Sequence, residues 1–197
     1  MFYEPFTNPA NRSGWIEVIT GSMFSGKTEE LIRRLNRAGY ANQCVEIYHT
    51  KIDTRSGNNQ ILSHSSKSLT SVAVSSSTDI LALTKFPDVT GIDEGQFFDE
   101  HLPEVCNTLA GKGVRVIVAG LDMDFRGKPF GPMPRLMSIA ENVTKVHAVC
   151  MRCGNPALYS FRKTKISEQI LVGASELYEP LCRKCYQIAN PDQYDKN

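Results

Sequence analysis

The chain has 197 residues, of which 41% are hydrophobic and 22% are charged, and its formal net charge is +1. This composition is typical of a globular protein with one full core and room for a small appendage, and the near-neutral charge argues against general attraction to nucleic acid or to an anionic membrane. No apolar run reaches the length of a membrane span, and residues 1–13 lack the apolar centre of a secretion signal, so we expect a cytoplasmic protein.

A strand, a glycine-rich loop and a helix organise the first part of the chain. After a polar arm over residues 1–13, the apolar run 15–20 predicts a buried strand. The next eight residues read G-x-x-x-x-G-K-T, the P-loop pattern, and apolar residues at helical spacing follow. The residues predicted to bind the phosphates of ATP are Gly21, Ser22, Met23, Phe24, Ser25, Gly26, Lys27 and Thr28.

In such a loop, backbone N–H groups and the helix N-terminus together bind phosphate. Lys27 would reach the β- and γ-phosphates, and the hydroxyl of Thr28 would ligate Mg²⁺. The alternative is a glycine-rich turn that matches by chance. Because the glycine, the lysine and the threonine are all in register after a strand, the pattern favours a phosphate site.

Further strands and helices alternate along the chain, which predicts an α/β fold: a parallel sheet with helices on both faces. Strands are expected at residues 44–48, 68–74, 89–92, 114–119 and 145–149. Helices are expected at residues 101–110 and 135–142, and a further short helix is expected to end at residue 83. The polar segment 49–67 is predicted to be a mobile loop or a hairpin with a flexible tip. We therefore expect an arm (1–13), a P-loop domain (14–149), a small C-terminal domain (150–190) and a tail (191–197).

Two carboxylates follow the strand predicted at residues 89–92. Ligands collect at the carboxyl ends of parallel strands, so Asp93 is expected to help Thr28 hold Mg²⁺. Glu94 is then free to position, or to accept a proton from, an attacking hydroxyl or water. Spacing alone does not separate a kinase from an ATPase at this point.

Aromatic residues stand in the loops after two predicted strands, at Phe97 and Phe98 and at Phe125 and Phe130. Such rings could clamp a planar base, and the alternative is that they pack the loops onto the sheet. From the residues alone, both interpretations stay open.

Four of the six cysteines form two C-x-x-C pairs near the C-terminus. They are Cys150, Cys153, Cys182 and Cys185. Four thiolates in this pattern predict a closed, tetrahedral and therefore structural Zn²⁺ site. Because a domain this small has little core, zinc would hold the intervening segment against the substrate site. The other two cysteines, Cys44 and Cys106, are expected to be small buried side chains.

Taken together, these motifs resemble the type II thymidine kinases. The matching segments are G-S-M-F-S-G-K-T at 21–28, D-E-G-Q-F-F at 93–98, L-D-M-D-F-R-G-K-P-F-G at 121–131 and V-G-A-S-E-L-Y at 172–178 between the cysteine pairs. The resemblance covers residues 14 to about 186. It implies Mg²⁺-assisted transfer of the ATP γ-phosphate to the 5′-hydroxyl of thymidine, and of deoxyuridine, in nucleoside salvage for DNA synthesis.

The resemblance also implies roles for individual residues. Glu94 matches the general base, Asp93 to Gln96 match a second nucleotide-contacting segment, and Asp53 and Arg55 lie in a flexible loop near the triphosphate. Residues matching the nucleoside site are Phe97 and Phe125 on the two faces of the base, Met23 and Leu121 near its 5-methyl group, Val172, Gly173 and Ala174 in a loop called the lasso, and Tyr178 at the sugar. The family further implies a homotetramer and feedback inhibition by thymidine triphosphate (dTTP).

Two other functions compete with this one. A DNA-associated ATPase would bind nucleic acid through its zinc ribbon, and the only local basic cluster is Arg152, Arg162, Lys163, Lys165, Arg183 and Lys184. The net charge of +1 and the absence of a long basic stripe argue against it, so we expect no nucleic-acid or membrane partner. A nucleotide sensor without turnover is the second alternative.

Overall fold

A computed structural model describes residues 13–52, 60–62, 68–164 and 177–191. Its centre is a six-stranded sheet in which every neighbouring pair of strands is parallel. In spatial order the strands are β5 (Val72–Val74), β2 (Val45–Thr50), β6 (Val89–Ile92), β7 (Arg115–Gly120), β1 (Trp15–Thr20) and β8 (Asn142–Lys145). Since β6, β7 and β1 lie side by side, the loops that follow these three strands leave the sheet at one edge.

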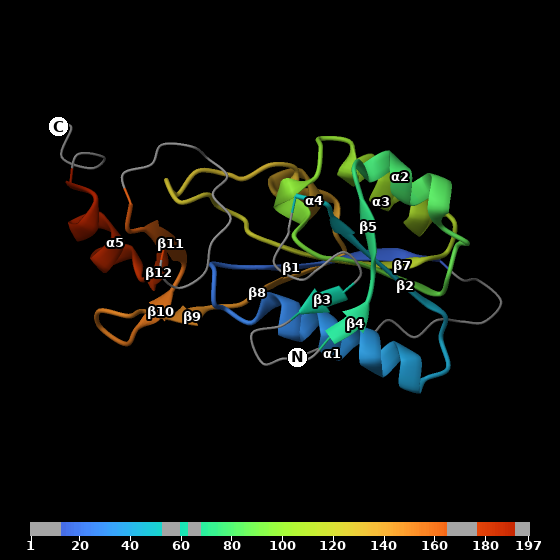
Figure 1. Ribbon diagram of the computed structural model, residues 1–197, viewed down its shortest axis with the longest axis horizontal. Helices are drawn as coiled ribbons and strands as arrows, with labels where there is room; N and C mark the ends of the chain where they lie inside the picture. Colours follow the sequence, from blue (N-terminus) through green and yellow to red (C-terminus); the bar gives the residue numbers. More distant parts are fainter. Residues whose placement is uncertain (1–12, 53–59, 63–67, 165–176, 192–197) are drawn as a thin grey trace.

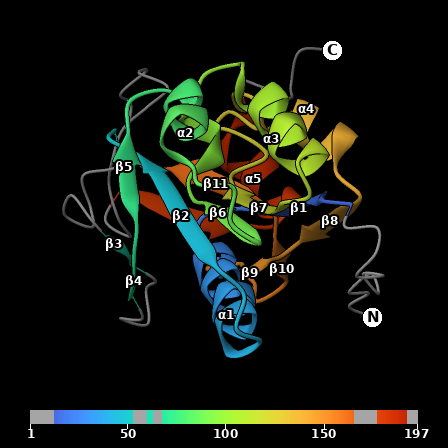
Figure 2. The same ribbon diagram turned by 90° about the vertical axis from the view of Figure 1, so that its right-hand side faces the viewer.

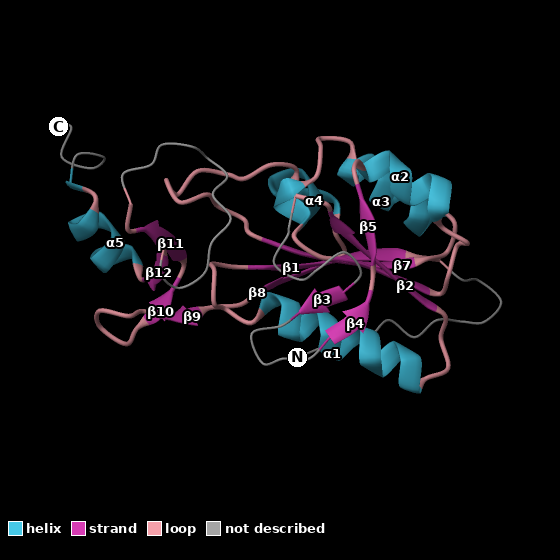
Figure 3. Ribbon diagram, in the orientation of Figure 1, coloured by secondary structure: helices cyan, strands magenta, loops and turns pink. Residues whose placement is uncertain are grey.

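Helices cover both faces of this sheet. Figure 1 and Figure 3 show α1 (Lys27–Tyr40) on one face and α2 (Ser77–Leu83), α3 (Leu102–Gly111) and α4 (Met133–Ile139) on the other. The view in Figure 2 shows the same two layers on either side of the strands. The buried side chains of α1, among them Leu31 and Leu35, pack with strand residues in one core cluster, and Leu102 and Leu136 belong to the cluster on the opposite face. The predicted α/β fold is therefore confirmed.

A smaller unit stands at one end of the sheet, at the left of Figure 1. It contains the antiparallel pairs β9 (Ala148–Val149) with β10 (Pro156–Ala157) and β11 (Tyr159–Arg162) with β12 (Tyr178–Leu181), followed by α5 (Arg183–Ala189). Ala157, Leu181 and Tyr186 are fully enclosed in a third core cluster. We call this region, residues 148–164 and 177–191, the C-terminal unit.

The segment predicted as one strand at residues 68–74 is divided between two sheets. β4 (Ser68–Thr70) pairs antiparallel with β3 (Gln60–Leu62), whereas β5 adds to the parallel sheet beside β2. Ser71 lies at the break, and its hydroxyl contacts Nδ1 of His49 at 2.9 Å. Residues 60–62, within the segment 49–67, therefore form one strand of an antiparallel pair, and the other strand lies just beyond the segment.

Two boundaries near residue 140 differ from the sequence-based prediction. α4 ends at Ile139 instead of Asn142, and residues 142–145 form β8, so the strand predicted at residues 145–149 is displaced. Glu141 explains the early helix end, because its carboxylate accepts a hydrogen bond of 2.7 Å from the N–H of Ile16 on β1. That bond brings Asn142 alongside Glu17, where strand pairing begins.

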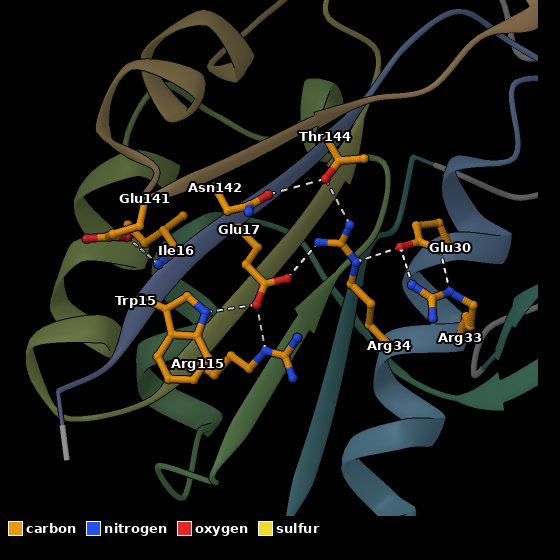
Figure 4. Close-up of polar contacts among 10 residues, drawn as sticks. All are labelled: Trp15, Ile16, Glu17, Glu30, Arg33, Arg34, Arg115, Glu141, Asn142 and Thr144. Atoms are coloured by element: carbon orange, nitrogen blue, oxygen red, sulfur yellow. Dashed lines mark hydrogen bonds and ion pairs between the residues drawn. The ribbon is translucent and has the colours of Figure 1, made fainter. Parts of the chain in front are cut away.

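Buried charged side chains connect β1, α1 and β7 in the N-terminal half of β1. Glu17 on β1 accepts hydrogen bonds from Arg34 (2.6 Å) and from Arg115 on β7 (2.7 Å), as Figure 4 shows. Its third donor is the ring N–H of Trp15, at 2.8 Å. Burial raises the pKa of the Glu17 carboxyl, but the hydrogen bonds and charges of the two arginines, with the Trp15 N–H, outweigh it and hold this pKa below its usual value.

In the part of the chain that the structure describes, no helix combines the length and the apolar character needed to cross a membrane.

Candidate functional site

The loop between β1 and α1 has the backbone conformation that its glycines permit. Gly21 has φ 148°, and a Cβ there would lie 2.1 Å from the carbonyl oxygen of Val146. Gly26 has φ 83° and precedes the first residue of α1. Both positions favour glycine, because an L side chain is strained at such φ values. The loop therefore closes tightly around the N-terminus of the helix, the arrangement that binds phosphate.

Polar side chains of the loop point back into it. The ammonium of Lys27 donates a hydrogen bond of 2.8 Å to the carbonyl oxygen of Ser22, and the hydroxyl of Ser25 donates one of 2.7 Å to the same oxygen. Lys27 thus lies over the loop, within reach of any phosphate group bound by its N–H groups.

The side chains of Thr28 and Asp93 contact each other at the edge of the sheet where the parallel strands end. The hydroxyl oxygen of Thr28 lies 3.2 Å and 3.4 Å from the two carboxylate oxygens of Asp93, which directly follows β6. Burial raises the pKa of Asp93 to about 7, and the charge of the neighbouring Glu94 adds to this effect. A hydroxyl and a buried carboxylate at this distance are oxygen ligands suited to Mg²⁺, which would favour the ionised form of Asp93.

Glu94 begins a short turn of 3₁₀-helix, η1 (Gly95–Phe97), and its backbone is left-handed, with φ 52° and ψ 44°. One carboxylate oxygen accepts a hydrogen bond of 2.5 Å from the side-chain amide of Gln96. The oxygen of that amide accepts a bond of 2.8 Å from the N–H of Leu121, directly after β7. The carboxylate is therefore linked to the loop of the next strand.

Three aromatic residues predicted to contact the nucleoside, Phe97 and Phe125 at the base and Tyr178 at the sugar, have different neighbours. The ring of Phe97 packs edge-to-face on Phe130, with ring centres 5.8 Å apart. The guanidinium of Arg162 lies 3.7 Å from the centre of the Phe125 ring. Arg162 also donates two hydrogen bonds, of 3.0 Å and 2.6 Å, to the hydroxyl of Tyr178.

Arg162 was not recognised as a site residue from the sequence, where it belonged to a basic cluster. It is buried, with 5% of its surface exposed, and it joins the two predicted nucleoside contacts Phe125 and Tyr178. Its position on β11 opposite Tyr178 on β12 follows from an antiparallel pairing that the sequence does not announce. One sequence signal for this strand is the alternation of aromatic residues at Tyr159 and Phe161, a pattern that is typical of strands.

The C-terminal unit contacts both the P-loop and the loop after β7. The hydroxyl oxygen of Ser160 accepts a hydrogen bond of 3.0 Å from the N–H of Met23, and the side chain of Phe24 packs on the core cluster of the unit. Tyr186 donates a hydrogen bond of 2.7 Å to the carbonyl oxygen of Phe125. Residues predicted to bind ATP and the nucleoside are thus supported by the same unit.

The four cysteines of the two C-x-x-C pairs converge in this unit. Their sulfur atoms all lie within 4.8 Å of one another. Four thiolates around one Zn²⁺ at a Zn–S length of about 2.3 Å would have sulfur atoms roughly 3.8 Å apart. Burial raises the pKa of Cys150, but hydrogen bonds from backbone N–H groups and from Cys153 lower it to about 6 overall, which favours the thiolate. The donor set fits a zinc ion.

Five predicted site residues lie outside the described residues: Asp53, Arg55, Val172, Gly173 and Ala174.

Comparisons with known proteins converge on one family. The family model described as thymidine kinase matches residues 14–186. A thymidine kinase of Bacteroides fragilis is 54% identical over 100% of this chain and 99% of its own length. A thymidine kinase of Porphyromonas gingivalis is 53% identical over 100% of this chain and 98% of its own. One from a Rhodothermus species is 52% identical over 90% of this chain and 84% of its own.

Proposed function

The chain belongs to the thymidine kinase family, and we propose that Glu94 is the general base in its transfer of the ATP γ-phosphate to the 5′-hydroxyl of thymidine. The single observation that carries this role is the position of Glu94. It directly follows Asp93, whose carboxylate contacts P-loop Thr28, and its own carboxylate is hydrogen-bonded toward the loop of Leu121. The attacking hydroxyl must be positioned between the phosphate loop and the loop that contacts the nucleoside. A carboxylate at this place can position that hydroxyl and accept its proton.

The triphosphate would be bound by the P-loop, from Gly21 to Thr28, and Mg²⁺ would be held by Thr28 and Asp93. Their contact at 3.2 Å and the burial of Asp93 support this assignment. When bound, Mg²⁺ neutralises the charge of the phosphates. Lys27 would bind the β- and γ-phosphates from its position over the loop. We propose that Asp53 and Arg55 contact the triphosphate as well.

The nucleoside would lie between the loops after β1, β6 and β7 and the C-terminal unit. Phe97 and Phe125 are both half-buried, as are Met23 and Leu121, so each side chain retains surface for a ligand. We propose that Tyr178 acts together with Arg162, since the two are hydrogen-bonded beside Phe125. Val172, Gly173 and Ala174 are proposed to read the base through their backbone groups.

A kinetic comparison of Glu94→Gln with the unchanged chain tests the general base. Glutamine keeps the shape but cannot accept a proton, so kcat is expected to fall roughly 100- to 10,000-fold while ATP still binds. The assay is transfer of radiolabelled phosphate to each of the four deoxynucleosides and to deoxyuridine. We expect thymidine and deoxyuridine to be phosphorylated. Normal turnover of Glu94→Gln would remove Glu94 from the mechanism.

We further propose that the end product of the pathway, dTTP, inhibits the enzyme and that the chain assembles as a homotetramer, as the resemblance to the family implies. Steady-state assays with added dTTP test the first proposal. Sedimentation of the purified chain tests the second, and a monomer at all concentrations would contradict it.

A further inference from the structure

Gln96 is buried inside the protein, beside the proposed general base. Only 2% of its surface is exposed, and it forms part of η1, between the end of β6 and Phe97. Its side-chain amide connects two groups of the site, the carboxylate of Glu94 at 2.5 Å and the N–H of Leu121 at 2.8 Å.

The chemistry of its partners fixes the orientation of this amide. An ionised carboxylate only accepts hydrogen bonds, and a backbone N–H only donates them. The amide nitrogen of Gln96 must therefore face Glu94, and the amide oxygen must face Leu121. A flipped amide would set a donor against a donor and an oxygen against an oxygen.

Two glycines leave space for this arrangement. A Cβ at Gly120, the last residue of β7, would lie 2.9 Å from the side-chain oxygen of Gln96. A Cβ at Gly131 would lie 2.5 Å from its backbone oxygen, and φ at Gly131 is 48°. Both contacts are tighter than real Cβ contacts, so the chain approaches Gln96 closely from two sides and keeps it in one place.

We propose that Gln96 is a positioning residue for Glu94 and that the side chain of Gln96 does not contact the phosphates of ATP. Its amide holds the Glu94 carboxylate at a fixed place relative to Leu121, in the loop that faces the nucleoside. Fixing a glutamate side chain in one rotamer costs conformational entropy. A hydrogen bond that fixes the side chain before the substrate binds removes this cost from the reaction step. This role depends on the function proposed above for Glu94.

The test compares Gln96→Met, which has a similar length but no amide, with the unchanged chain. We expect kcat to fall about 10- to 100-fold, because a misplaced reacting group loses rate to that extent. The KM values for ATP and thymidine, and the Kd for ATP measured by calorimetry, are expected to stay within about twofold. Gln43→Met is the matched control, in the turn between α1 and β2, and it should leave kcat unchanged.

A weakened Kd for ATP with unchanged kcat would overturn the proposal and make Gln96 a phosphate contact. If Gln96→Met does not fold, Gln96→Asn replaces it, since asparagine keeps the amide but is too short to reach both partners. The same loss of kcat is expected for it, and full activity would overturn the proposal.

A double-mutant cycle separates positioning from a general packing effect. If Gln96 acts through Glu94, adding Gln96→Met to Glu94→Gln should lower kcat by less than about twofold further. A loss as large as that in the unchanged background would overturn the proposal. Should Glu94→Gln alone keep its kcat, the proposed function fails. If instead Glu94→Gln is inactive but Gln96→Met is fully active, only the positioning role fails.

Discussion

Glu94, the proposed general base, has an unfavourable backbone conformation. Its φ of 52° and ψ of 44° fall in the left-handed region, which disfavours residues that carry a Cβ by about 1–2 kcal/mol. Strain of this kind persists where the surrounding structure fixes it, and it concentrates at functional sites. Here the conformation turns the chain from β6 into η1, which brings Gln96 back to the Glu94 carboxylate.

This strain predicts an unusual order of stability for two variants of Glu94. Glu94→Gly and Glu94→Ala both remove the carboxylate and differ only in the Cβ. We expect Glu94→Gly to be the more stable of the two by about 1 kcal/mol in urea denaturation, because glycine adopts the left-handed conformation without strain.

The control pair is Asn107→Gly and Asn107→Ala, at an exposed position of α3. There the glycine variant should be less stable by roughly 0.8–1.0 kcal/mol, the usual helix preference. The same order at both positions would mean that Glu94 is not strained.

At this scale, contiguous motifs are predictable and distant partners are not. The P-loop pattern and the acidic pair carry their chemistry in adjacent residues, and the structure brings Thr28 and Asp93 together as predicted. The bond between Gln96 and Leu121 joins positions 25 residues apart and depends on the adjacency of β6 and β7. Cys106 is buried as expected, but Cys44 is exposed, in the loop position directly before β2.

The helix that follows the P-loop is attached to the sheet by charge as well as by apolar packing. Arg34 of α1 is 1% exposed and donates hydrogen bonds to Glu17 on β1 and to Thr144 on β8. Because α1 also presents its N-terminus to the P-loop, this attachment sets the position of Lys27 and Thr28.

Removal of the shared carboxylate should therefore destabilise the fold. In Glu17→Gln, buried Arg115 loses its partner carboxylate and buried Arg34 keeps only Glu30, so we expect a loss of about 3–5 kcal/mol in the free energy of unfolding. Glu104→Gln is the control, because its ion pair with Arg135 is exposed to solvent and should contribute little to stability. Equal effects in urea denaturation would contradict the role assigned to the buried cluster.

The same cluster predicts a pH dependence. The pKa of Glu17 is lowered in the folded state, so the native chain binds this proton less readily than the unfolded chain. Its stabilising contribution is complete above the unfolded pKa of about 4.3 and is lost as the pH falls through the folded value. The stability difference between the unchanged chain and Glu17→Gln should thus be constant from neutral pH to about pH 5 and shrink in stronger acid. A difference that grows in acid would contradict this assignment.

Elements with strong periodic patterns were predictable, and elements defined by long-range pairing were not. The apolar run at β7 and the helical spacing in α1 are local signals. β8 is an edge strand in which half-buried and exposed residues alternate, so it lacks the apolar run that marks a central strand. Its start depends on the bond between Glu141 and Ile16, 125 residues away.

At the scale of the whole molecule, the C-terminal unit is a support for both loops of the site. It bonds the N–H of Met23 through Ser160 and the carbonyl of Phe125 through Tyr186. The two cysteine pairs predicted a zinc-stabilised unit, but its contact with the P-loop joins residues 137 positions apart and had no local signal. The C-terminal unit, which contains the four-cysteine cluster, is therefore connected to the P-loop through packing.

This connection predicts that loss of zinc also weakens ATP binding. Cys182→Ser removes one of four ligands, and since a structural zinc contributes folding free energy directly, we expect zinc content to fall well below one per chain and the unfolding midpoint to drop by about 10 °C or more. The affinity for ATP measured by calorimetry should fall about tenfold, equivalent to roughly 1.4 kcal/mol, because Met23 and Phe24 lose their support.

Cys44→Ser is the control for the loss of a thiol, since Cys44 is exposed and lies at the start of β2, away from the cysteine cluster. It should retain zinc, stability and ATP binding. A Cys182→Ser variant that loses zinc yet binds ATP with unchanged affinity would show that the P-loop keeps its shape without the C-terminal unit. In that case Ser160 and the packing around Phe24 would matter to the nucleoside side of the site alone.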